Sequence, residues 1–106
     1  MDANLPSFDT PFCDWLDVTF SPEAFSFEEF CDGMVDIYPY LSEIKTKDET
    51  VHLFSLKTGT LQISFKKTFI RLSLSGGALM GLRAADAFLP LLGWISDWPH
   101  RVTRID

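Results

Sequence analysis

The chain has 106 residues, the size of one domain, and its 46% hydrophobic content suffices for a single core without metal ions or disulfides. No run approaches the roughly 20 apolar residues of a membrane helix, and the acidic N-terminus lacks the basic and apolar regions of a secretion signal. We therefore expect one cytoplasmic domain over residues 1–106, away from membranes, with Cys13 and Cys31 as reduced core residues.

Charge is distributed unevenly along the chain, although its net value is −6. Residues 1–43 contain ten acidic and no basic side chains, which gives −10, whereas residues 44–106 contain nine basic and five acidic ones, which gives +4. Two alternatives follow. The halves neutralise each other in the fold, or the molecule is bipolar, with an acidic face for a basic partner and a basic face for phosphate.

The first part of the chain predicts a lead-in, a strand and a helix. Residues 1–11 have two prolines and no periodicity, and apolar and polar residues then alternate over Phe12–Phe20. Ser26 and Glu29 form a capping box that predicts a helix start, and Pro39 stops the helix. Its expected apolar stripe comprises Phe27, Phe30, Cys31, Met34, Val35 and Tyr38.

The middle of the chain predicts a meander of three strands. Tyr38 is expected in the core and Tyr40 at its rim, in preference to an aromatic binding edge, and the polar stretch Ser42–Thr50 predicts a loop. From Val51 to Ser75 apolar residues recur at every second position, and Thr58-Gly59 and Lys67-Thr68 predict the two hairpin turns.

The last part predicts a helix and a closing strand. Ser75-Gly76-Gly77 reads as a flexible turn rather than a phosphate cradle, because no P-loop spacing follows it. The helix Ala78–Phe88 either ends and restarts with Pro90 in the first turn, or kinks there. Its buried stripe is expected to contain Leu79, Leu82, Ala85, Leu89 and Leu92.

The residues His100–Asp106 predict a last strand, so the expected order is β-α-β-β-β-α-β. This pattern indicates an α+β domain in which an antiparallel sheet carries helices on one face. No repeat of 20–50 residues is present, which excludes a solenoid.

The sequence contains no pattern typical of catalysis or of cofactor binding. His52 and His100 belong to no metal-ligand motif, and no nucleophile motif of the Gly-x-Ser-x-Gly type is present. The acidic residues of the first predicted helix are most simply its solvated side. We expect no metal, no cofactor and no enzymatic activity.

Two stretches carry a family resemblance. The segment Cys13-Asp14-Trp15-Leu16-Asp17-Val18-Thr19-Phe20 resembles the opening strand of the replication initiation factors of filamentous phages and rolling-circle plasmids. The residues Gly76-Gly77-Ala78-Leu79, Leu82-Arg83 and Arg101-Val102-Thr103-Arg104-Ile105-Asp106 are similar to a later segment of that family. The likeness spans nearly the whole chain but only the front part of such an initiator.

The resemblance implies a DNA-nicking enzyme for a complete initiator, with Asp106 as a metal-ligand position. The catalytic tyrosine of the family lies beyond the motifs found here, and Tyr38 and Tyr40 match no nucleophile motif. We therefore expect no nicking by this polypeptide.

We expect one of two alternative functions and rank one above the other. The first is a non-enzymatic phage or mobile-element protein that binds a protein partner, as an inhibitor of host defence of the anti-CRISPR kind, through a phosphate-mimicking acidic face of Glu28, Glu29, Asp32 and Asp36. The second is the DNA-binding half-domain of a rolling-circle initiator, which would use Lys57, Lys66, Lys67, Arg71, Arg101 and Arg104. It ranks second because the net charge is negative and the bases form no run along the sequence. A homodimer through an exposed sheet edge is compatible with both.

Overall fold

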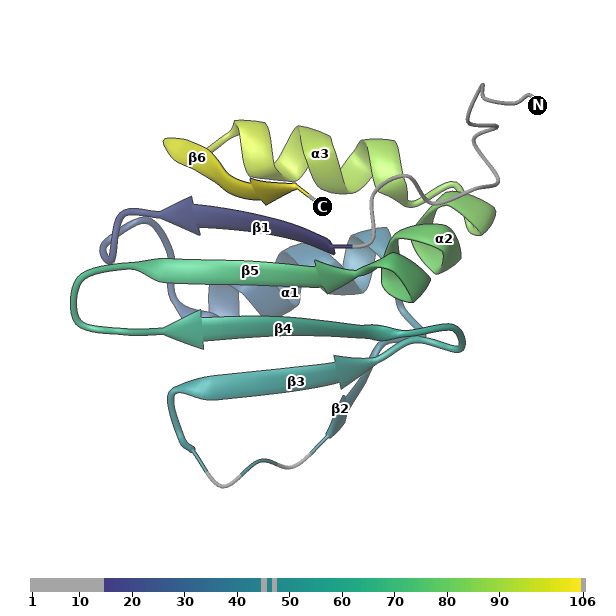
Figure 1. Cartoon of the computed structure of the whole chain (residues 1–106), viewed down its shortest axis with the longest axis horizontal. Helices are drawn as coiled ribbons and strands as arrows, with labels where there is room; N and C mark the ends of the chain where they lie inside the picture. The colour runs from purple at the N-terminus through teal and green to yellow at the C-terminus, as the bar shows by residue number, and fades with distance from the viewer. Residues whose placement is uncertain (1–14, 45, 47, 106) are drawn as a thin grey trace.

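The computed structural model describes residues 15–44, 46 and 48–105, and its centre is a six-stranded antiparallel sheet (Figure 1). The strand order is β2-β3-β4-β5-β1-β6, so that the first strand lies between the fifth and the last. This confirms the predicted α+β class with an antiparallel sheet. The elements are β1 (Trp15–Phe20), α1 (Phe27–Ile37), β2 (Ser42–Ile44), β3 (Val51–Ser55), β4 (Thr60–Phe65), β5 (Ile70–Ser75), α2 (Gly76–Ala84), α3 (Phe88–Ser96) and β6 (His100–Ile105).

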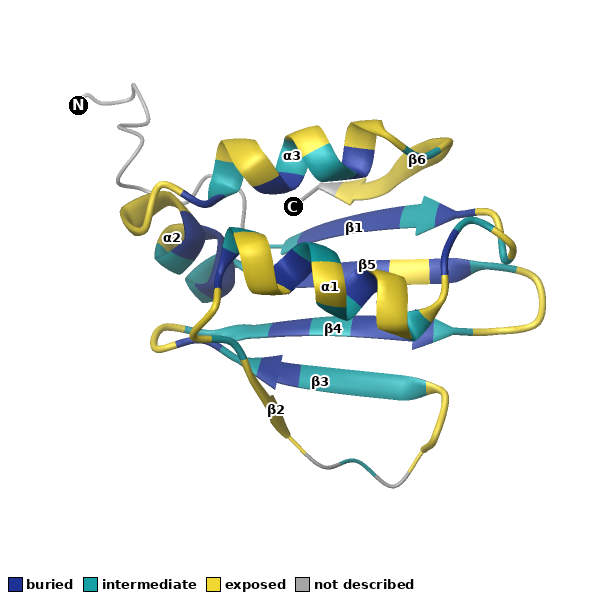
Figure 2. Ribbon diagram, turned by 180° about the vertical axis from the view of Figure 1, so that it is seen from behind, coloured by how far each residue is buried: buried dark blue, intermediate teal, exposed yellow. Residues whose placement is uncertain are grey.

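The core lies between one face of the sheet and the helices α1 and α3 (Figure 2). Every second residue of the central strands points into it, and these side chains are at most 8% exposed: Leu16, Val18, Phe20, Leu61, Ile63, Ile70, Leu72 and Leu74. Helix α2 packs at the end of the sheet against β5 and β4. Among the described residues no helix covers the other face of the sheet (Figure 1).

Helices α1 and α3 approach each other at Gly33. A Cβ atom on this residue would collide with Nε1 of Trp94, so no larger residue fits without displacing the indole. The indole itself packs edge-on against Phe25, Phe20 and Phe30, at centroid distances of 4.9, 6.5 and 5.7 Å. Because Gly33 has no side chain, the Trp94 indole of α3 can lie directly against α1 and pack into the aromatic core.

The predicted start of α1 is confirmed, whereas one member of its apolar stripe is wrong. Ser26 and Glu29 form the capping box in both directions. Tyr38 is 9% and Tyr40 is 82% exposed, as expected for a core and a rim residue. Val35, however, is 63% exposed. At about 100° per residue it lies roughly 80° around the helix from Phe27, at the margin of the stripe.

One element differs from the sequence-based expectation, and the predicted start of the first strand lies outside the described residues. The short edge strand β2 lies within the predicted loop Ser42–Thr50 and pairs Ser42–Ile44 with β3. The described part of the first strand begins at Trp15, and Cys13, Asp14 and Asp106 lie outside the described residues. The meander and its turns are confirmed, since Lys66 donates its backbone N–H to Phe69 across the second turn.

The two glycines after β5 are helical and do not form a flexible turn. Ser75 caps α2 by accepting the backbone N–H of Ala78 at 3.2 Å. A Cβ atom on Gly77 would collide with the backbone oxygen of Thr58, and the hydroxyl of Thr58 donates to the carbonyl of Gly77. Gly77 therefore serves a close approach of two backbones, which leaves no room for a phosphate beside it.

The predicted long helix is two helices, and Pro90 lies in the first turn of the second, as one of the two alternatives expected. Asp86 adopts a left-handed backbone with φ 56° at the break, a conformation that Asp tolerates better than most residues. Leu89 is consequently 75% exposed and Ala85 is also exposed, so these two members of the predicted stripe are wrong. Leu79 and Leu82 are buried as expected.

No single helix in the described ranges is long and apolar enough to cross a membrane. Only α2 and α3 taken as a pair pass the test of length and composition, and they meet at a bend of 108°.

The contact at Gly33 generates a matched pair of substitutions. We expect Gly33→Ala to destabilise the fold by about 1–3 kcal/mol, because the added methyl group collides with the Trp94 indole. Gly93→Ala on α3 is the control, since nothing lies within 4 Å of its Cβ position, and it should stabilise by about 0.5–1 kcal/mol. Urea unfolding of both variants measures the difference. Equal effects would contradict the packing described at Gly33.

Candidate nucleic-acid interface

The uncovered face of the sheet is polar. Thr19, Gln62 and Ser73 alternate with core residues on three neighbouring strands. The hydroxyls of Thr19 and Thr103 lie 3.0 Å apart, and the amide of Gln62 donates to the hydroxyl of Ser64. The centre of this face therefore consists of polar side chains, of which Asp17, Ser64 and Ser73 are themselves buried among their neighbours, and apolar side chains such as Leu53 lie on the same face toward the β2 edge.

Two arginines flank Thr19 on this face. Residue Thr19 pairs with Arg71 on β5 and with Arg101 on β6. Directly paired residues point to the same side of a sheet, and adjacent strands lie about 5 Å apart, so the two Cα atoms are about 10 Å apart. Both side chains are exposed.

A β-bulge adds a third arginine. The pairs Asp17–Arg104 and Val18–Val102 follow each other, and Thr103 is the extra residue on β6. In a regular strand Arg101 and Arg104 would face opposite sides, because they are three positions apart. The bulge turns both to the uncovered face, and together with Arg71 they are called the arginine strip below.

Aromatic rings support two arginines of the strip. The guanidinium carbon of Arg71 lies 4.7 Å from the centre of the Phe69 ring, and that of Arg104 lies 5.3 Å from the centre of a Trp15 ring. Nε1 of Trp15 in turn donates to the carboxylate of Asp17 at 2.7 Å. Stacking uses the flat face of a guanidinium, whereas recognition of phosphate uses the N–H groups in its plane.

The three lysines expected to bind nucleic acid differ in their contacts and in their positions on the sheet. The ammonium of Lys66 lies 3.3 Å from the carboxylate of Asp48 and 2.8 Å from the hydroxyl of Thr50, so it ties the β4–β5 turn to the loop before β3. Lys67 is exposed in the same turn, at the end of the sheet near Arg71. Lys57 follows β3 at the opposite end and does not join the strip.

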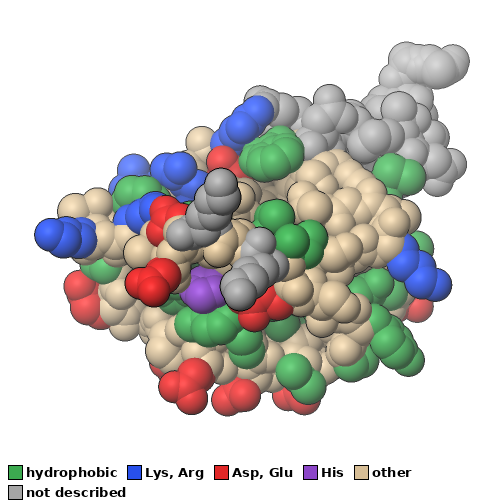
Figure 3. All heavy atoms as spheres, turned by 90° about the horizontal axis from the view of Figure 1, so that it is seen from below, with side chains coloured by type: hydrophobic (Ala, Val, Ile, Leu, Met, Phe, Trp, Pro, Cys, Tyr) green, Lys and Arg blue, Asp and Glu red, His purple; other side chains and the backbone are tan. Residues whose placement is uncertain are grey.

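The four predicted acidic residues lie on the other side of the molecule. Glu28, Glu29, Asp32 and Asp36 are all exposed on α1, which lies behind the sheet as seen in Figure 1. Glu29 is occupied by the capping box, whereas Glu28, Asp32 and Asp36 recur at every fourth position and form one row, called the acidic row below. In Figure 3 acidic side chains follow the lower margin and basic ones gather at the upper left, which favours the bipolar alternative.

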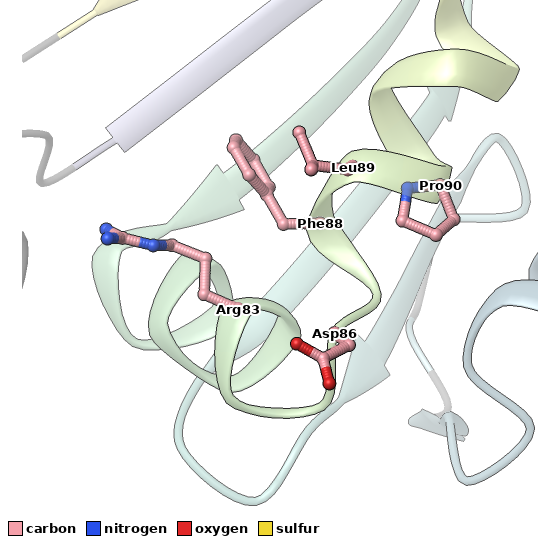
Figure 4. A pocket seen from close by; sticks show the side chains of 5 residues that line it. All are labelled: Arg83, Asp86, Phe88, Leu89 and Pro90. Carbon is pink, nitrogen blue, oxygen red and sulfur yellow. The ribbon is translucent and has the colours of Figure 1, made fainter.

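A hollow of about 450 Å³ at the α2–α3 connection is separate from both charged surfaces (Figure 4). Arg83, Asp86, Phe88, Leu89 and Pro90 line it. It lies where β5 ends, whereas Arg71 stands near the start of that strand. The hollow brings together one acid, one base and apolar side chains but no group typical of a catalytic centre.

Within the described ranges no three His, Cys, Asp or Glu residues are placed to hold a metal ion. Cys31 is half-buried, and its pKa is raised by burial and by the nearby carboxylates of Glu43 and Asp32, which favours the unreactive thiol. His52 stacks on Phe27 at a ring distance of 3.7 Å and lies 3.2 Å from the carboxylate of Glu43, which ties α1 to the edge of the sheet.

Comparison with family models, curated proteins and solved structures found no match for this chain. The resemblance to replication initiation factors therefore rests on the sequence motifs quoted above.

Sequence reasoning missed Trp15, Phe69 and Thr103 as parts of this surface. In the sequence, Trp15 and Phe69 alternate with the apolar residues that form the core. This alternation is the signal that both lie on the same face of the sheet as Arg71 and Arg104. The bulge at Thr103 has no signal in the sequence, because it depends on pairing with a strand more than eighty residues earlier.

The contacts of Asp48 predict an observable titration. The pKa of this carboxyl is lowered to about 2, first by the backbone N–H and the hydroxyl of Thr50 and then by Lys66. Its stabilising contribution is therefore present above an unfolded pKa of about 4 and is lost as the pH falls toward 2. We expect Thr50→Val, which removes the hydroxyl, and Lys66→Met, which removes the ammonium, each to raise the pKa of Asp48, measured by NMR titration of the carboxyl carbon. In both variants the pKa should stay below its unfolded value, because the backbone N–H of residue 50 still donates to the carboxylate. An unchanged pKa in either variant would contradict these contacts.

Proposed function

We propose that this chain binds DNA through the arginine strip, as the DNA-binding half-domain of a rolling-circle replication initiator. The supporting observation is that Arg71, Arg101 and Arg104 share one uncovered face of the sheet. The motif resemblance to replication initiation factors points to the same ligand. Nicking of DNA is not part of the proposal, because neither tyrosine of the chain matches a nucleophile motif.

The net charge of −6 does not oppose this function, because of where the charges lie. The acidic row stands on α1, behind the sheet, and is separated from the strip by a packing layer of about 10 Å. At physiological ionic strength the Debye length is about 8 Å, so much of the repulsion is screened before it reaches the strip. On the strip's own face Asp17 pairs with Arg104, but this carboxylate is only 9% exposed and accepts a hydrogen bond from Trp15, so a phosphate at the strip meets the exposed arginines first.

The size of the strip sets the expected strength of binding. Each neutralised phosphate contributes roughly 0.9 to the slope of log K against log salt on duplex DNA, so three arginines give a slope near −2.7. Such a slope is typical of a protein that contacts few DNA phosphates and contributes to DNA binding as one part of a larger assembly. We expect a dissociation constant in the range of about 10⁻⁴–10⁻⁶ M, the usual range for binding without base readout.

A double substitution tests this proposal. Arg71→Gln with Arg101→Gln should weaken binding of a fluorescent oligonucleotide and reduce the salt slope by about 2, because two phosphate contacts are lost. Lys57→Gln is the matched control, since it removes one positive charge at the far end of the sheet. Fluorescence anisotropy at several salt concentrations measures both effects.

Three results would contradict DNA binding by the strip, two of them from the variants. One is unchanged affinity in the double variant, and the other is an equal loss in the Lys57→Gln control. Absence of measurable binding by the unaltered chain at low salt would contradict it as well.

The acidic row supports a second candidate, a non-enzymatic inhibitor of host defence that occupies the nucleic-acid channel of a partner. Glu28, Asp32 and Asp36 are like charges at i, i+4 spacing, and no basic residue stands in the last turn of α1. The like-charge pairs cost a few tenths of a kcal/mol each, and Asp36 in the last turn costs about 0.3–1 kcal/mol against the helix dipole, whereas Glu28 in the first turn is favourable to that dipole. The exposed Val35 and Tyr40 lie beside and beyond the row. A function in binding would account for a charge pattern that the fold itself disfavours.

This candidate predicts opposite effects on stability and on binding. Asp32→Asn with Asp36→Asn should stabilise the chain by about 0.5–1 kcal/mol in urea unfolding, because it relieves repulsion within α1. The same variant should lose the proteins that the unaltered chain retains in a nuclease-treated pull-down from host lysate. Glu23→Gln, also exposed but outside α1, is the control. Retention of the same proteins by the double variant would rule out the acidic row as the docking surface.

A further inference from the structure

We propose that the outer edge of β6 accepts an extended peptide with acidic residues at alternate positions, which adds to the sheet as a further strand. This inference does not rest on DNA binding, although it uses Arg101 and Arg104 of the arginine strip. It rests on the backbone of the last strand and on the side chains that flank it.

The outer edge of β6 is a sheet edge within the described part of the chain. Strand β6 has six residues and stands at the end of the strand order, where it pairs with β1. Alternate backbone N–H and C=O groups of an edge strand point away from its neighbour and form a template for another strand. The other edge strand, β2, has three residues and offers a shorter template.

The side chains along β6 specify the chemistry of the added strand. On the uncovered face Arg101 and Arg104 are exposed, and both point to the same side because of the bulge. On the helix face Val102 pairs with the buried Val18 and is itself 47% exposed. An added strand therefore meets positive charge on one face and an apolar side chain on the other. Alternation of Glu or Asp with Val or Thr satisfies both.

The same side chains disfavour a second copy of this chain as the occupant. Antiparallel pairing of two β6 strands about their midpoint would place Arg101 opposite Arg104 of the second copy, twice over. Like charges directly opposite each other are destabilising in a sheet. Charged side chains and β-bulges on an edge strand are also features that hinder its pairing with the same strand of an identical chain. A strand of opposite charge meets no such repulsion.

Synthetic peptides test the proposal on the whole chain. The probe is a fluorescent hexapeptide with Glu at its first, third and fifth positions and Thr or Val between them. One control carries Lys in place of each Glu, and a second keeps Glu but has N-methyl groups on alternate backbone nitrogens, which removes strand pairing without changing the charge. Fluorescence anisotropy gives the affinities, and ¹⁵N NMR locates the contact.

We expect the Glu peptide to bind at least tenfold more tightly than either control and to shift the amide signals of residues 100–105. Arg101→Glu should reduce its affinity by tenfold or more, and sedimentation should show a monomer in the absence of peptide. Equal affinity for the N-methylated peptide would overturn strand addition and reduce the contact to charge alone. Equal affinity for the Lys peptide, no binding, or a dimer formed through β6 would overturn the proposal.

Discussion

The position of β1 between β5 and β6 is the constraint on which the rest of the structure depends. Its apolar residues Leu16, Val18 and Phe20 close the core beneath α1 and α3, and its alternate residues form the centre of the uncovered face. The two neighbouring strands are brought together only by this strand, although they lie about thirty residues apart in the sequence. The arginine strip exists because β1 sets the register of Arg71 and of Arg101 at the same residue, Thr19.

One-sided covering of the sheet then separates the charges. Acidic side chains of the first third of the chain lie on α1, outside the helical layer, whereas arginines of the second half lie on the uncovered strands. Four of the ten acidic side chains of residues 1–43 thus lie on α1, and three of the nine basic side chains of residues 44–106 lie on the opposite face of the sheet. Each face is matched to a ligand of opposite charge, and the salt dependence of binding distinguishes phosphate from a protein partner.

Periodicity predicted the fold class and the meander, and the capping box predicted the start of α1, because each depends on neighbours in the sequence. It failed where a long-range contact decides the outcome. Leu89 was placed in a stripe that assumes one continuous helix, and the left-handed Asp86 breaks that helix. The pair Gly76-Gly77 predicts a flexible turn, whereas both residues are helical and the backbone of Thr58 packs against Gly77. The basic residues likewise appear scattered in sequence, and only the strand register and the bulge at Thr103 assemble three of them.

The most direct measurement of the proposed DNA binding is a ¹⁵N NMR titration of the whole chain with an oligonucleotide at low salt. DNA binding by the uncovered face predicts amide shifts at Thr19, Arg71 and Arg101 that saturate together and shrink as salt is added. Residues of α1 should remain unshifted, because they lie behind the sheet. Shifts confined to α1 or to the α2–α3 connection, or an unchanged spectrum, would contradict it.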